Sequence, residues 1–157
     1  MDTGAPVRSS RTGTRGAQYA GWGCRNGRTA PRNGQTGVVL LIDAANVVGS
    51  RPTGWWRDRA GAARAFVDQV RAAVDSGRVA PPVVVVLEGK AREGVQAGVA
   101  EGVTVLHAAG SGDDMLIDVA SNPSGQVITL VTADRELRQR AEALGADVVG
   151  PGWLLVT

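Results

Sequence analysis

The chain has 157 residues, enough for one domain of ordinary size, and it is 43% hydrophobic but only 4% aromatic, so its core must be built mainly from aliphatic side chains. One cysteine and one histidine exclude a disulfide framework and a Cys-based zinc site within one chain, and leave little scope for a His cluster. The longest apolar runs have five residues, against the ~20 that a membrane-spanning helix needs, so we expect no membrane span and a cytoplasmic protein.

The net charge of +2 is unevenly distributed. Residues 1–36 carry a net charge of +5 and residues 37–157 a net charge of −3. The first segment is rich in Arg and Gly and has no apolar periodicity, so we expect a disordered tail followed by one folded domain over 37–157. Three interpretations of the tail stay open: an electrostatic arm for RNA, an organelle-targeting segment, or an upstream-extended start of the chain.

From residue 38 onward, apolar runs alternate with amphipathic segments. The predicted strands are Val38–Ile42, Val83–Leu87, Val103–His107, Val127–Val131 and a short one near Asp147–Val149. The predicted helices are Arg57–Ser76, a weak one around Ala91–Ala100, a short one from Asp113, and Arg135–Leu144. Strands that are apolar on both faces and alternate with helices predict a three-layer α/β fold. We expect a parallel sheet of about five strands with helices on both faces.

Carboxylates follow the predicted strands. Asp43, Glu88 and Asp134 each stand at or just past the end of a strand, and Asp113 and Asp114 open a helix directly after another. In a parallel sheet these ends meet at the edge where ligands bind. Carboxylates packed together repel one another unless a cation neutralises them, and oxygen ligands suit Mg²⁺ or Mn²⁺. Such an ion held by carboxylates hydrolyses phosphate esters, although each acid alone is also compatible with an Asx turn, a helix cap or a solvated charge.

The ordered motifs resemble a known family. Strand-Asp43-x-x-Asn46, strand-Glu88, Asp114-x-x-Ile117-Asp118 and strand-Thr132-Ala133-Asp134-Arg135 are similar to the NYN domain family of PIN-like nucleases, nearest its YacP-like branch, over residues 38–153. The resemblance implies a parallel Rossmann-like sheet and RNA cleavage that depends on a divalent metal.

Carried over position by position, the resemblance assigns a role to most of these acids. It makes Asp43, Asp114 and Asp134 the catalytic, metal-binding acids, with Asp113 as the alternative to Asp114 in the doublet. Asn46 shapes the first turn, and Asp118 is a supporting acid. At the remaining position, residue 88, this chain has Glu where relatives usually have Asp, so a metal ligand there is displaced by one methylene.

Four residues are candidates for holding RNA. Trp55 and Arg57 follow the first turn, and a stacking ring beside a cation suits bases and phosphates, although a Trp packed over a helix start is equally compatible. Lys90 follows the second strand and Arg135 follows Asp134, so both are placed for phosphate contact or for solvent.

Two other functions stay open. A non-catalytic RNA-binding module would keep the fold without turnover, and a nucleotide pyrophosphohydrolase would use the same metal and carboxylates. Dinucleotide binding is disfavoured, because Gly110-Ser111-Gly112 lacks the third glycine of that motif. The sequence leaves open whether the protein is a monomer or a homodimer.

Overall fold

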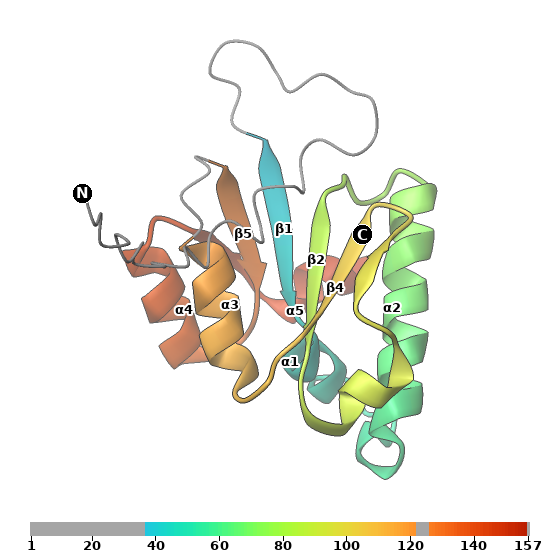
Figure 1. Ribbon diagram of the computed structural model, residues 1–157. Coiled ribbons are helices and arrows are strands. Elements are labelled where there is room, and N and C mark those ends of the chain that lie inside the picture. Colours follow the sequence, from blue (N-terminus) through green and yellow to red (C-terminus); the bar gives the residue numbers. More distant parts are fainter. Residues whose placement is uncertain (1–36, 122–125, 157) are drawn as a thin grey trace, which may run out of the picture.

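A computed structural model describes residues 37–121 and 126–156, so the predicted tail over 1–36 lies outside the described residues. The described chain forms one six-stranded sheet in the order β3-β4-β2-β1-β5-β6 (Figure 1). The strands are β1 Val38–Asp43, β2 Val83–Leu87, β3 Gly98–Ala100, β4 Val103–His107, β5 Val127–Val131 and β6 Asp147–Val149. All neighbouring strands pair in parallel except β3, which pairs antiparallel with β4. The predicted three-layer, largely parallel α/β fold is therefore confirmed.

Helices cover both faces of the sheet because the central strands are apolar on both sides. The helices are α1 Ala44–Gly49, α2 Arg59–Asp75, α3 Gly112–Ala120, α4 Arg135–Ala143 and α5 Pro151–Val156, with 3₁₀ turns η2 Trp55–Arg57 and η3 Gly89–Gly94. Leu40 and Ile42 of β1 pack against α1 and α2, whereas Leu41, one position apart, packs against α3 and α4. Within the described ranges, no helix is long and apolar enough to cross a bilayer.

The helix expected around Ala91–Ala100 is wrong. This segment is the 3₁₀ turn η3 followed by the edge strand β3. Glu101 and Gly102 both have positive φ, at 55° and 78°, and they form a two-residue connection to β4. Positive φ at both central residues twists the chain as a tight antiparallel hairpin requires, so the segment folds back as a sixth strand.

Two helix boundaries also differ from the prediction. The turn expected after Asp43 is a short helix, α1, which continues directly from β1 at the lower end of the sheet in Figure 1. The long helix starts at Arg59 rather than at Arg57, because the Asp58 side chain accepts a hydrogen bond from the Gly61 N–H at 2.8 Å and caps it there.

Candidate functional site

Asp43 is a nearly buried carboxylate at the carboxyl end of the central strand β1. Its side chain is 7% exposed and caps α1 by accepting a hydrogen bond from the Asn46 N–H at 3.2 Å. Its other oxygen accepts a hydrogen bond from the Thr132 hydroxyl at 3.0 Å. The structure thus fixes both carboxylate oxygens in place from two neighbouring strand ends.

The loop after β5 is tied to the loop after β1. Thr132 also accepts a hydrogen bond from the Asp134 N–H at 3.1 Å, so one hydroxyl links two of the predicted acids. The Asn46 side-chain oxygen accepts a hydrogen bond from the Ala133 N–H at 2.8 Å. Asn46 therefore does more than shape its own turn, because it holds the segment that carries Asp134. Asp134 in turn caps α4 by accepting from the Leu137 N–H at 2.9 Å.

Of the doublet that opens α3, Asp113 is the member that lies near the other acids. The charges of Asp134 and Glu88 both act on Asp113, and Asp113 acts on Asp43. Asp114 has a 75% exposed side chain and lies 3.3 Å from Arg140. Asp118 is exposed one turn further along α3.

Glu88 connects β2 to the start of α3. Its carboxylate accepts a hydrogen bond from the Gly112 N–H at 2.6 Å. This bond satisfies a backbone N–H in the first turn of α3, where the Ser111 side chain makes no capping hydrogen bond. A Cβ on Gly112 would stand 2.5 Å from this carboxylate oxygen, so a larger residue at that position would displace the Glu88 carboxylate.

Four acids thus share one edge of the sheet: Asp43, Glu88, Asp113 and Asp134, which we call the acidic edge. Burial raises the pKa of Asp43 from 3.8 to about 6, the two hydrogen bonds oppose the shift, and the charges of Asp113 and Glu88 add to it. Burial also raises the pKa of Asp113, with contributions from Asp134 and Glu88 and an opposing one from Arg140. In the described part of the chain, no three acidic, His or Cys side chains already converge into a metal-coordinating group.

The four candidate RNA contacts belong to η2, η3 and α4. Trp55 is half-buried and lines a pocket that Glu88 also lines. Arg57 is exposed, with its guanidinium 6.0 Å from the ring centre of Trp56. Lys90 and Arg135 are both exposed, and in the chain they follow Glu88 by two residues and Asp134 by one.

The fold resembles that of a protein of known structure. The fold matches the crystal structure of a mutant of Rae1 (YacP) from Bacillus subtilis, with a TM-score of 0.56. The two chains are 18% identical over a match that covers 74% of this chain and 72% of that one. No protein-family profile and no curated protein sequence matches the chain. The match supports the fold relationship to YacP that the sequence motifs had indicated.

Sequence reasoning assigned no role to two residues of the site. Thr132 is 2% exposed and bridges Asp43 to the Asp134 backbone, and its signal was a hydroxyl directly after the strand β5 and two residues before Asp134. Gly112 makes room for Glu88. Helical spacing in the sequence also indicates the position of Asp113. It precedes the buried Leu116 by three residues and therefore lies on the same face of the helix.

Proposed function

We propose that this chain is a ribonuclease that hydrolyses RNA phosphodiester bonds at the acidic edge with Mg²⁺ or Mn²⁺. The proposal rests on one observation, the environment of the Asp43 carboxylate. A 7% exposed carboxylate lies beside two other acids, its pKa is raised, and, within residues 37–121 and 126–156, no basic side chain is among the groups that act on it. Buried carboxylates with a raised pKa cluster at sites that bind a cation or carry out a reaction. The fold match to YacP and the motif resemblance to the NYN family support RNA as the substrate.

The donor set fits a hard divalent ion. All candidate ligands are carboxylate oxygens, and we assign the ion to Asp43, Asp113 and Asp134 in place of the set with Asp114. Asp113 is only half-buried, so its side chain has room to rotate toward Asp43, whereas Asp134 keeps one oxygen on the Leu137 N–H and would use its other oxygen for the ion. When bound, the ion would activate water and stabilise the leaving oxygen of the phosphodiester.

The remaining residues position this set. Thr132 and Asn46 hold the Asp43 carboxylate and the Asp134 loop in fixed relation through three of their hydrogen bonds. Glu88 anchors the start of α3, and thus Asp113, from the end of β2. Arg135 and Lys90, exposed cations that follow Asp134 and Glu88 in the chain, would offset the repulsion between this edge and the RNA phosphates.

The test is cleavage of end-labelled single-stranded RNA by the purified protein with Mn²⁺, Mg²⁺ or EDTA. We expect cleavage with either metal, none in EDTA, and loss of cleavage in Asp43→Asn. Asp68→Asn is the matched control, because Asp68 is a 65% exposed acid of α2 that lies near Arg71 and away from the acidic edge. Intact RNA binding without cleavage would favour the binding module, and the absence of both would direct the test to nucleoside triphosphates.

A further inference from the structure

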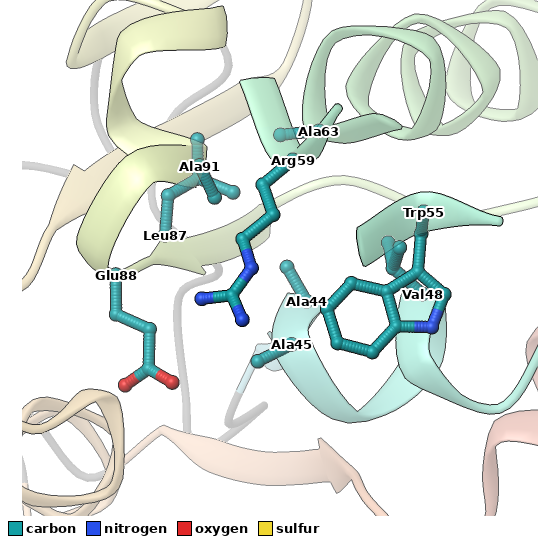
Figure 2. A pocket seen from close by; sticks show the side chains of 9 residues that line it. All are labelled: Ala44, Ala45, Val48, Trp55, Arg59, Ala63, Leu87, Glu88 and Ala91. Carbon is teal, nitrogen blue, oxygen red and sulfur yellow. The ribbon is translucent and has the colours of Figure 1, made fainter. Parts of the chain in front are cut away.

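A pocket of about 270 Å³ opens beside the acidic edge, between α1, η2, the start of α2 and η3 (Figure 2). Two lining residues join it to that edge. Ala44 follows Asp43 directly in the chain, and Glu88 belongs to both the pocket and the edge. A phosphate held at the acidic edge would therefore bring the neighbouring part of the same RNA strand to the mouth of this pocket.

The walls of the pocket suit a flat, uncharged ring. Figure 2 shows the Trp55 ring on one side, the Glu88 carboxylate on the other, and the Arg59 guanidinium between them. The Arg59 guanidinium lies 5.6 Å from the centre of the Trp55 ring. It makes no ion pair with any side chain in the described residues, so its planar face and its charge are available to a ligand.

The space itself comes from small side chains. Ala44, Ala45, Ala63 and Ala91 all line the pocket, where larger apolar residues would have filled it. Liquid water occupies about 30 Å³ per molecule, so the volume exceeds that of a single bridging water several times. It lies just below the roughly 300 Å³ at which sites for small organic ligands begin, which fits one ring system better than a whole nucleotide.

We propose that this pocket holds one unstacked nucleobase of the RNA, adjacent to the phosphodiester at the acidic edge. The base stacks on the Arg59 guanidinium, which Trp55 supports, and Glu88 offers an acceptor to its N–H groups. A base in a duplex is unavailable for such stacking, so the pocket selects single-stranded RNA. This inference rests on the proposed ribonuclease function for its substrate class.

The variant Arg59→Lys distinguishes base stacking by Arg59 from simple attraction of its charge to phosphate. Lysine keeps the positive charge but has no planar group, so Arg59→Lys preserves attraction to phosphate and removes stacking. Ala45→Leu provides an independent test, because Ala45 is an exposed residue of α1 that lines the pocket, and a leucine there fills the space without changing any charge. Arg138→Gln is the control, because Arg138 is exposed on α4 and pairs with Glu142 on the opposite face of the sheet.

The experiment measures binding of a labelled single-stranded RNA octamer, and of the same octamer with every base removed, by fluorescence anisotropy in EDTA. In the wild-type protein, removal of the bases should weaken binding about tenfold or more. In Arg59→Lys and Ala45→Leu that ratio should fall to about threefold or less, while Arg138→Gln keeps the wild-type ratio.

Equal binding of both RNAs by the wild-type protein, or an unchanged ratio in Arg59→Lys and Ala45→Leu, would overturn the pocket assignment. Metal-dependent cleavage is measured separately on the intact octamer. Base-dependent binding without cleavage would support the pocket and reject the ribonuclease, whereas cleavage without base-dependent binding would reject the pocket alone.

Discussion

Replacing Asp43 with asparagine should make the protein more stable at neutral pH. The pKa of this carboxyl is about 6 in the folded protein and 3.8 when unperturbed, so the folded state holds the proton more tightly than the unfolded chain does. Below about pH 4 the carboxyl is largely protonated in both the folded and the unfolded chain, so it does not lower the free energy of unfolding. Between pH 4 and 6 only the unfolded chain ionises, so the wild-type free energy of unfolding falls by about 1.4 kcal/mol per pH unit.

The total loss by pH 7 is about 3 kcal/mol at most. An asparagine does not ionise, and its side-chain oxygen still accepts the Asn46 N–H bond that caps α1. Its NH2 group replaces the oxygen that accepted from the Thr132 hydroxyl, so it keeps a link there by donating to the Thr132 hydroxyl oxygen. The stability advantage of Asp43→Asn over the wild type should therefore be small near pH 4, grow up to about pH 6, and then remain constant. The variant that should abolish cleavage should thus be the more stable protein.

Urea unfolding at pH 4 to 8 in EDTA, followed by circular dichroism, measures this difference. Asp68→Asn should stay within about 0.5 kcal/mol of the wild type at every pH, because that exposed acid is well solvated. A pH-independent difference between Asp43→Asn and the wild type would refute the reasoning, since burial would then not disfavour the charged form of Asp43.

The other predictions concern single side chains of the site and one close backbone contact. Thr132→Val should cost about 1–3 kcal/mol and move the acid limb of the pH–rate profile to higher pH, because it removes a hydrogen bond that lowers the pKa of the buried carboxyl; Thr132→Ser should restore both. Asp113→Asn should lower metal-dependent cleavage about 100-fold or more, and Asp114→Asn by no more than about fivefold. The reverse order in the same kinetic assay would reassign the ligand. Gly94→Ala should lower the free energy of unfolding by about 1–3 kcal/mol, because its Cβ would overlap a backbone carbonyl of α2, whereas Gly110→Ala has open space and should match the wild type in urea.

Side-chain periodicity predicted most of the fold because it is a local property. The all-apolar run Val83–Leu87 indicated a strand covered on both faces, and it became β2, buried along its whole length. The same reasoning failed around Ala91–Ala100. Backbone conformation at Glu101 and Gly102 and pairing with β4 decided that segment, and neither produces an apolar periodicity.

The sequence by itself determined that acids would follow the strands and that the strand ends would form one edge. Only the tertiary structure decided which acids meet there, because that depends on how α3 packs against the sheet and on cross-strand bonds. The charge of Asp134 acts on Asp113, whereas Asp114 is 75% exposed beside Arg140, and Thr132 binds Asp43 across 89 positions of sequence. The pocket beside Arg59 has the same origin, since its alanines come from three separate elements that pack together only in the folded chain.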